Sequence, residues 1–174
     1  TVFIIVAIIN SINFIDGIDG LAISNVLLFI CGFEFFAVEQ TTYSNLSTIL
    51  IASIIPLYYF NFRKKNKVFL GDSGSLFLGG IISIYVITVL TNDYIMSPEY
   101  DLHKILFVIS ILFYPIIDII RIFFLRLIKG TSPFKPDKNH IHHLILKKIN
   151  NHFLATLIIT SISILFLIFI QIIF

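Results

Sequence analysis

The sequence of 174 residues is poor in charge and has a single cysteine. Charged residues make up 13% of it and hydrophobic residues 57%, whereas an average soluble domain is roughly 25% charged. So few charges cannot cover the surface of a soluble globule, and the composition also argues against a disordered tail and a nucleic-acid-binding domain. Cys31 stands alone, which excludes an internal disulfide. The composition predicts an integral membrane protein that contacts a lipid bilayer and no nucleic acid.

Alternation of apolar and polar residues, which a membrane-spanning β-barrel needs, is also missing, because the apolar runs are continuous. In lipid, an unpaired backbone forces such runs into helices. A span needs about 20 mostly apolar residues, and six runs are candidates. They are residues 1–14, 21–38, 46–62, 75–90, 105–127 and 153–174. We therefore expect an all-α, polytopic integral membrane protein with about six transmembrane helices, forming a single domain over residues 1–174.

A starting methionine and a signal peptide are missing as well. Thr1 stands inside an apolar stretch that has neither a basic flank nor a cleavage site. The first apolar run is also the shortest of the six. These features predict that the chain is part of a longer protein.

Lysine and arginine are distributed unevenly along the chain. Eleven of the twelve lie in two connections, residues 61–72 and 121–148, whereas the connection at 92–103 is acidic. Positive residues stay on the cytoplasmic side of a membrane, so both basic connections should lie there. Helix parity then places the turn at 16–20 on the same side. The three segments richest in polar, Gly and His residues are thus expected to form one site on the cytoplasmic face.

The first of these polar segments combines two asparagines with two Asp-Gly pairs. Asn10, Asn13 and Asp16 are spaced by three, so they should lie near one another at the inner end of a helix. Asp19 follows in a turn that glycines keep open to a ligand. Two carboxylates without a nearby cation are costly at a membrane boundary unless water, metal or substrate satisfies them. An ordinary Asp-Gly turn is the alternative, and we favour a ligand site.

The second polar segment, residues 69–80, directly follows a basic run. Asp72 or Ser73 is a natural N-cap for the next span. A helix N-terminus among glycines offers N–H groups to an anion, and Asp72 could there hold Mg²⁺, which favours carboxylates together with phosphate oxygens. The alternative is that Asp72 only caps the helix. Small residues at a spacing of four predict close helix packing rather than chemistry. They are Ser75, Gly79 and Ser83.

The third polar segment carries three histidines within four residues, His140, His142 and His143. They could bind a transition metal or phosphate oxygens, but structural zinc would require Cys partners or better helical spacing. Lys135 and Lys138 make anion binding the better interpretation. The alternative is a solvated basic loop beside anionic lipid headgroups. On a helix, His140 and His143 would share a face and His142 would point elsewhere.

Asp118 and Arg121 lie three residues apart in the fifth apolar run. At this spacing the two side chains can pair, which lowers the cost of placing both charges near the bilayer. We interpret them as a structural pair.

Carboxylates, an expected Mg²⁺ and clustered histidines on one face indicate a substrate with phosphate groups. The membrane boundary indicates a second substrate that arrives from the lipid. Phosphoryl transfer depends mostly on positioning and charge neutralisation, which these groups suit. A transporter of phosphate esters would use the same groups, so composition leaves both classes open.

In their order along the chain, the three segments resemble the motifs of the polyprenyl-phosphate N-acetylhexosamine-1-phosphate transferases. This family contains the phospho-MurNAc-pentapeptide translocase. The motifs read N-x-x-N-x-x-D-G-x-D-G-L from Asn10, F-x-G-D-x-G-S from Phe69 and P-F-x-P-D-x-x-H-x-H-H from Pro133. The third is more similar to the branch that acts on UDP-GlcNAc-type sugars for O-antigen, teichoic acid or capsule. The resemblance covers essentially the whole chain.

The resemblance implies a reaction at the bacterial cytoplasmic (inner) membrane. An oxygen of a polyprenyl phosphate, expected to be undecaprenyl phosphate, attacks the β-phosphate of a UDP-N-acetylhexosamine. UMP leaves, and a polyprenyl-diphosphate sugar remains in the membrane as a lipid-linked intermediate of cell-envelope polysaccharide synthesis. The implied cofactor is Mg²⁺, with Mn²⁺ as the alternative ion, and the implied sugar is GlcNAc.

The resemblance also implies roles for individual residues. Asp72 is the Mg²⁺ ligand, and Asp16 with Asn13 organises the nucleotide-sugar and diphosphate region. Asp19 and Phe69 recognise uracil by a hydrogen bond and by ring stacking. The implied catalytic residues are Asp16, Asp72, His140, His142 and His143. The implied substrate-binding residues are Asn10, Asn13, Asp19, Phe69, Asp118 and Arg121.

One family feature is missing. The family has an earlier cytoplasmic loop with adjacent Asp residues, and no Asp-Asp pair occurs in this sequence. The family also has about four more spans on the N-terminal side, so the resemblance places this chain in the C-terminal half. We expect the parent protein to be an enzyme and these 174 residues alone to lack activity. The rival interpretations are a cation-binding transporter fragment and a non-catalytic membrane subunit. The sequence leaves a homodimer open.

Overall fold

The computed structural model describes residues 1–91, 94–97, 100–130, 132 and 139–174. Within these ranges the chain is helical, and its only extended pairing is a single antiparallel bridge between Ala37 and Met96. The helices are α1 (Val2–Ile15), α2 (Leu21–Phe36), α3 (Ser44–Asn61), α4 (Gly71–Leu90), α5 (Asp101–Ile111), α6 (Phe113–Ile128), α7 (Ile141–Ile149) and α8 (His152–Ile173). The expectation of an all-α chain is confirmed for these residues.

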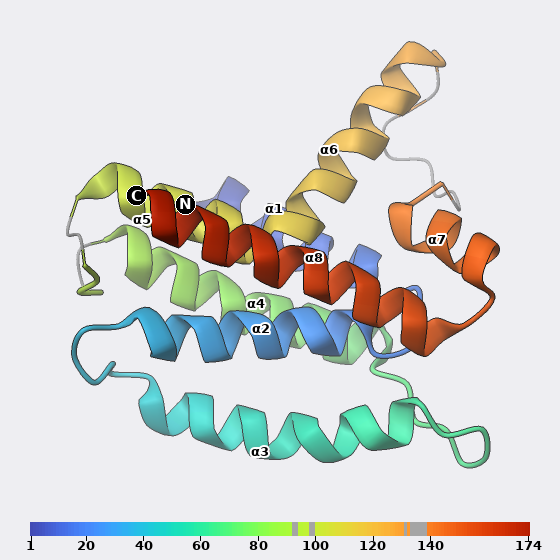
Figure 1. The fold of residues 1–174 in the computed structure, drawn as a ribbon, viewed down its shortest axis with the longest axis horizontal. Helices are drawn as coiled ribbons and strands as arrows, with labels where there is room; N and C mark the ends of the chain where they lie inside the picture. The colour runs from blue at the N-terminus through green and yellow to red at the C-terminus, as the bar shows by residue number, and fades with distance from the viewer. Residues whose placement is uncertain (92–93, 98–99, 131, 133–138) are drawn as a thin grey trace.

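Most of the helices pack side by side into a bundle. In Figure 1, α2 lies between α3 and α8, and α4 lies behind α2. The helices keep much of their outer surface apolar, as the exposed fractions of Phe35 (80%), Leu165 (67%) and Ile128 (81%) show. Apolar side chains on the outside of a helical bundle are typical of a protein that lipid surrounds.

Helices α1 and α4 pack closely along their length, because small residues of α4 face α1. A Cβ added at Gly79 would lie 2.8 Å from the Ile9 Cα, so a side chain there would collide with backbone. The Ser83 hydroxyl donates to the Ile5 carbonyl at 3.4 Å. The prediction that the small residues at four-residue spacing mark close packing is therefore confirmed.

Among the described residues two helices, α4 and α8, are long and apolar enough to cross a membrane. A third crossing results if α5 and α6 count as one broken span, since they meet at an angle of 77°. The helices α1 and α2 are apolar but have only 14 and 16 residues. Each of the six predicted runs contains a helix, but the prediction of about six transmembrane helices is not confirmed.

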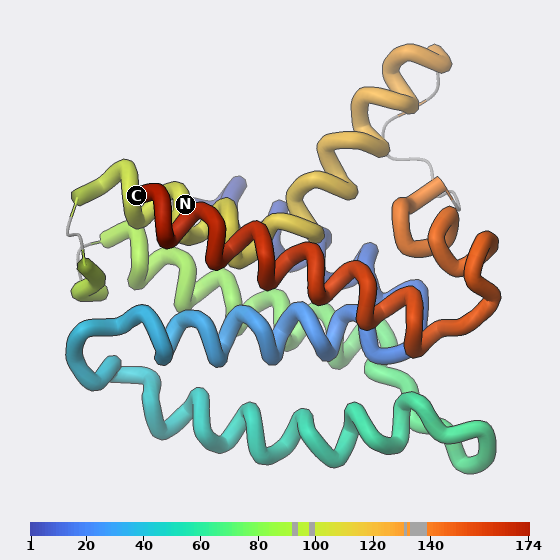
Figure 2. Tube along the Cα trace, viewed as in Figure 1, coloured from blue at the N-terminus to red at the C-terminus, as the bar shows by residue number. Residues whose placement is uncertain are grey.

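The fifth predicted span is not one continuous helix. It breaks at Leu112, and Figure 2 shows α6 leaving the bundle at an angle to α8. Pro115 explains the break, because it lacks the N–H that would bond to the Ile111 carbonyl and its ring crowds that position. Pro115 is tolerated in the first turn of α6, where a backbone donor is not required.

Candidate functional site

The three polar segments meet at one end of the bundle. The first covers the end of α1 and the turn after it, the second forms the start of α4, and the third leads into α7. In Figure 1 this is the end where α7 lies next to the start of α8. Charge distribution and helix parity predict this convergence, whereas the roles of the residues stay predictions.

Asn13 joins the first segment to the second. Its Nδ2 atom donates to Asp72 Oδ1 at 3.2 Å and to Ser75 Oγ at 2.9 Å. The close packing of α1 on α4 brings these groups within reach of one another. Asn13 therefore orients the carboxylate of Asp72, which is exposed at the end of the bundle.

Asp72 does not cap α4, nor does Ser73. The helix begins at Gly71 with Leu70 as its N-cap, and Asp72 lies in the first turn. The reason is the left-handed backbone of Gly71, with φ of +65°, which turns the chain into the helix earlier than the sequence suggests. In the first turn, the carboxylate of Asp72 still interacts favourably with the helix dipole.

Asp16 lies in the turn after α1 and connects that turn to the start of α4. Burial raises the pKa of Asp16 to about 6, a backbone hydrogen bond from Gly71 opposes the rise, and the charges of Asp72 and Asp19 add to it. Asp16 and Asp72 are thus close enough for their carboxylates to interact electrostatically. Two carboxylates held together in this way favour a cation.

The sequence suggests that neither Asp16 nor Asp19 has a cationic partner nearby, and for Asp19 this expectation is wrong. Lys67 Nζ lies 2.5 Å from Asp19 Oδ2, and His152 Nδ1 lies 3.2 Å from the same oxygen. The Thr156 hydroxyl donates to the Asp19 carbonyl at 2.7 Å. Because Lys67 follows α3 while His152 and Thr156 begin α8, two distant segments fix the position of Asp19.

Phe69 stands beside this ion pair. Its side chain is 67% exposed, and Lys67 Nζ lies 4.9 Å from the centre of its ring, a cation–π geometry. Lys67 therefore connects Asp19 and Phe69, the two residues to which the resemblance assigns uracil recognition.

Gly20 shows why this turn needs a glycine. Its φ of +74° is costly for other residues, and the rings of Phe62 and Tyr58 leave no room for a side chain. Its N–H donates to Asn61 Oδ1 at 2.5 Å, and Asn61 Nδ2 donates to the Val68 carbonyl at 2.8 Å. The end of α3 thus holds the turn that carries Asp16 and Asp19.

The three imidazoles form one cluster. Ring centres are 5.4 Å apart for His140 and His142, 4.3 Å for His142 and His143, and 6.4 Å for His140 and His143. The expectation that His142 points away from the other two is wrong. His140 precedes α7 as its N-cap, with ψ of 148°, so helical spacing does not apply to it. The Phe14 ring of α1 lies 6.0 Å from the His140 ring.

Asp118 and Arg121 contact the histidine segment, and this replaces the pairing expected between them. Asp118 Oδ2 lies 2.6 Å from His140 Nδ1, and its Oδ1 accepts from the Ile141 N–H at 2.7 Å. Arg121 Nη1 donates to the Asn139 carbonyl at 2.8 Å. Two neighbours on α6 thereby fix the beginning of α7.

His142 is the fully buried member of the cluster. Its Nδ1 lies 2.8 Å from the Tyr114 hydroxyl of α6. Burial lowers the pKa of His142, the charges of His143 and His140 lower it further, and Asp118 acts in the opposite direction. His142 is therefore neutral at physiological pH.

Asn10 has no hydrogen bond to any site residue that the structure describes, and its Nδ2 donates to the Val6 carbonyl of its own helix at 2.8 Å. Lys135 and Lys138 lie outside the described residues, so their predicted contribution to anion binding stays a prediction.

Sequence reasoning did not single out three residues that the structure places here. Tyr114 lies four residues before Asp118, a spacing that puts both on one face of a helix and could have revealed it. Lys67 lies two residues before Phe69, which in an extended segment places both on one side. His152 gave no signal, since 133 positions separate it from Asp19.

The residues at this end fit a hard divalent cation. The carboxylates of Asp16 and Asp72 are oxygen donors of the kind Mg²⁺ prefers, together with phosphate oxygens and water. Across the described residues no three His, Cys, Asp or Glu side chains form a ready-made ligand set.

Fold and site together define a helical membrane protein with carboxylates and imidazoles gathered at one end of its bundle. The family model described as "Glycosyl transferase family 4" matches residues 1–90, more than half of the chain. The chain belongs to glycosyl transferase family 4.

Several curated relatives carry closely similar names. The undecaprenyl-phosphate alpha-N-acetylglucosaminyl 1-phosphate transferase of Escherichia coli (strain K12) is 37% identical over 153 residues, 84% of this chain and 40% of that protein. The protein of the same name from Yersinia pestis is 36% identical over 154 residues, again 84% and 40%. The "Probable undecaprenyl-phosphate N-acetylglucosaminyl 1-phosphate transferase" of Bacillus subtilis (strain 168) is 35% identical over 168 residues, 95% and 45%. The chain thus spans less than half the length of these relatives.

Proposed function

We propose that this chain carries the donor side of a transferase site that moves GlcNAc-1-phosphate from UDP-GlcNAc to undecaprenyl phosphate. An oxygen of the lipid phosphate attacks the β-phosphorus of the donor, and the bond to the bridging oxygen breaks. UMP leaves with that oxygen, and a polyprenyl-diphosphate sugar stays in the membrane. The names of the relatives support this reaction.

The convergence of the three polar segments carries the proposal. Asn13 bonds to Asp72, Gly17 lies directly against His142, and Lys67 joins Asp19 to Phe69. A uridine diphosphate needs an aromatic face, a hydrogen-bond acceptor and charge neutralisation within one site. These residues offer all three at one end of the bundle.

We assign Mg²⁺ to Asp72, with Asp16 beside it. When bound there, the ion would neutralise the charge of the diphosphate oxygens. Asn13 holds the Asp72 carboxylate in place. His140 and His143 provide donors for phosphate or sugar oxygens, and Phe69 provides the exposed ring for the base.

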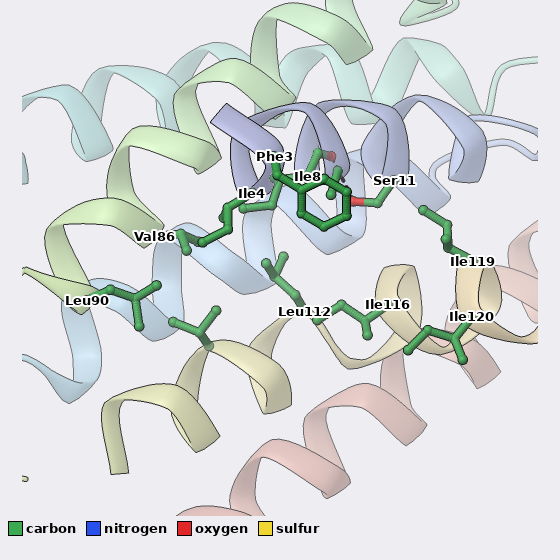
Figure 3. A pocket seen from close by; sticks show the side chains of 12 residues that line it. Phe3, Ile4, Ile8, Ser11, Val86, Leu90, Leu112, Ile116, Ile119 and Ile120 are labelled. Atoms are coloured by element: carbon green, nitrogen blue, oxygen red, sulfur yellow. Dashed lines mark hydrogen bonds between the residues drawn. The ribbon is translucent and has the colours of Figure 1, made fainter. Parts of the chain in front are cut away.

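An apolar groove supports a lipid acceptor. Figure 3 shows it between α1, α4, α5 and α6, and its volume is about 400 Å³. Ser11 and Ile119 line it, and these residues lie next in sequence to the polar end, near Asn13 and Asp118. A polyprenyl chain in the groove would place its phosphate at the carboxylate end. The bend between α5 and α6 helps open the groove.

The charge distribution supports placing this end at the cytoplasmic face of the bacterial inner membrane. Arg63, Lys64, Lys65 and Lys67 lie in the connection before α4, and Lys147 and Lys148 end α7. Positive residues are retained on the cytoplasmic side, where UDP-sugars are found. Six crossings, with α5 and α6 as one broken span, remain our proposal for the topology.

The decisive experiment follows labelled UMP into UDP-GlcNAc, in membranes that contain the whole protein together with undecaprenyl phosphate and Mg²⁺. We expect exchange with the wild type and a loss of at least about 100-fold with Asp72→Asn, since a metal ligand is removed. Asp101→Asn is the matched control, because Asp101 is also an exposed first-turn acid, at the start of α5. Normal exchange with Asp72→Asn would remove the metal assignment.

The same membranes separate the rival functions. A transporter would show ion-dependent flux of a phosphate ester and no exchange of UMP. A non-catalytic subunit would show neither exchange nor binding of UDP. Either result would contradict the transferase proposal.

A further inference from the structure

His142 differs from the other two histidines in its surroundings. Its side chain has no exposed surface, whereas His143 is partly exposed. One ring nitrogen, Nδ1, lies 2.8 Å from the Tyr114 hydroxyl, and Asp118 Oδ2 lies 4.0 Å from the same atom. The other nitrogen, Nε2, has no hydrogen-bond partner among the described residues.

The Nε2 edge of His142 is pressed against the first polar segment. A Cβ added at Gly17 would lie 2.5 Å from His142 Nε2 and 3.2 Å from His143 Cε1. Real Cβ atoms do not approach other heavy atoms at 2.5 Å, so only glycine fits this position. The backbone of Gly17 does not have a positive φ. The glycine is therefore required for close approach rather than for conformation.

We propose that His142 is a positioning residue that does not touch the substrate. It is wedged between Tyr114 of α6 and Gly17 of the turn after α1, and it thereby docks α7 on that turn. His143 then lies against the turn that carries Asp16, and His140 lies beside Phe14 of α1. The assignment of phosphate or sugar oxygens as the ligands of His140 and His143 rests on the proposed function. The packing of His142 between Tyr114 and Gly17 does not depend on it.

Burial and charge both support this division of roles. A side chain without exposed surface cannot reach a diphosphate, and burial with the neighbouring His143 and His140 lowers the pKa of His142 against the effect of Asp118. The groups facing it are Asp118 and Tyr114 from α6, and His140 and His143 from its own segment. A neutral imidazole is a poor phosphate ligand but packs well against a backbone.

The first test compares two variants by NMR of the histidine-labelled protein. Asparagine can place an amide where Nδ1 stands and keep the Tyr114 contact, whereas leucine cannot. We expect the imidazole chemical shifts of His140 and His143, recorded at one pH, to be kept in His142→Asn. They should change in His142→Leu and in Tyr114→Phe, because both variants lose the contact that positions α7. Equal behaviour of the Asn and Leu variants would overturn the proposal, and so would an ordinary titration of His142 near pH 6.5.

The second test is a double-mutant cycle for thermal unfolding. Gly17→Ala should lower the Tm because the new methyl group meets Nε2, and His142→Ala should lower it by leaving a cavity. In the double variant the space left by the imidazole accepts the methyl group, so the loss should be clearly smaller than the sum of the two single losses. Additive losses would overturn the wedge. Neither test needs donor or acceptor substrate, so its failure leaves the transferase proposal untouched, and a failed exchange assay leaves the wedge untouched.

Discussion

Asp16 is a carboxylate that the fold holds in an unfavourable environment. Its pKa is raised to about 6, mainly by burial, against about 3.9 for an aspartate in an unfolded chain. The folded protein therefore binds this proton more tightly than the unfolded chain does. The contribution of Asp16 to stability is complete below about pH 3.9 and is lost as the pH rises through 6. Such a strained group is typical of a site kept for function rather than for stability.

Replacing Asp16 by asparagine should consequently stabilise the protein at high pH. Without divalent cations, we expect Asp16→Asn to have a higher Tm than the wild type at pH 8, and the difference should shrink towards pH 4. Thermal unfolding in detergent at both pH values measures this. Asp101→Asn, at the opposite end of the bundle, should keep the pH dependence of the wild type. A lower Tm of Asp16→Asn at pH 8 would contradict the burial argument.

Lys67 fixes two neighbours at once, since it contacts the Asp19 carboxylate and the Phe69 ring. The side chains of Lys67 and Asp19 are 25% and 15% exposed, so solvent screens their attraction only in part. We expect Lys67→Ala to lower the free energy of unfolding by about 1 kcal/mol. Lys64→Ala, which changes an exposed lysine of the same connection, should change it by much less. Denaturant titration of both variants compares them, and equal effects would show that the ion pair adds no stability.

Among the helices, the packing of α1 on α4 depends on one glycine. A methyl group at Gly79 would lie 2.8 Å from the Ile9 Cα, whereas a methyl group at the adjacent Gly80 meets nothing within 4 Å. We expect Gly79→Ala to destabilise the protein by about 1–3 kcal/mol, because backbone must move. Gly80→Ala should be neutral or stabilise it by up to about 1 kcal/mol, as alanine is the better helix former. Thermal unfolding compares the Tm values of the two variants. Similar values would refute the close contact between Gly79 and Ile9.

The positions of the helices and the convergence of the three polar segments were largely predictable. Both follow from features that can be read along the sequence, namely the length of apolar runs and the distribution of lysine and arginine. The small-residue stripe, for instance, predicts that α4 packs closely against another helix, although it does not say which one. The break between α5 and α6 was less predictable, since Pro115 is compatible with either a kinked or a broken helix. The start of α7 depends on Asp118, which accepts from the Ile141 N–H across 23 positions. No local pattern encodes such a partner.

Within the candidate site, too, contacts between sequence motifs were predictable, whereas contacts that depend on tertiary packing were not. Asn13 and Asp72 belong to motifs that the sequence displays, so their proximity follows once the two segments share a face. The contacts of Asp19 with Lys67 and His152 depend on how α3 and α8 end and begin. The position of His142 under the other histidines depends on the non-helical backbone of His140. These are consequences of tertiary packing, which single-sequence patterns do not specify.

Over the whole molecule, polar groups gather at both ends of the bundle, but they are satisfied in different ways. At the end away from the candidate site, Glu34 of α2 accepts from Thr41 Oγ1 at 3.0 Å and from Ser47 Oγ at 2.5 Å. The Ser47 hydroxyl also contacts the Tyr85 hydroxyl of α4 at 2.9 Å. The hydrogen bonds of this carboxylate are made within the protein, and through Ser47 they link α2, α3 and α4. The carboxylate of Asp72 is exposed, and within the described part of the chain Asn13 is its single side-chain donor.

This contrast predicts opposite consequences for two similar substitutions. Glu34→Gln replaces charge-assisted hydrogen bonds by neutral ones, which should lower the free energy of unfolding by about 1 kcal/mol. It should leave the affinity for UDP in the presence of Mg²⁺ unchanged. Asp72→Asn should weaken that affinity at least about tenfold, because a ligand of the ion is lost, and should change the unfolding free energy little. Calorimetric binding and thermal unfolding of both variants test the division. If Glu34→Gln weakened UDP binding as much as Asp72→Asn does, the two ends could not be independent, since the outer carboxylate would then be coupled to the site along the length of the bundle.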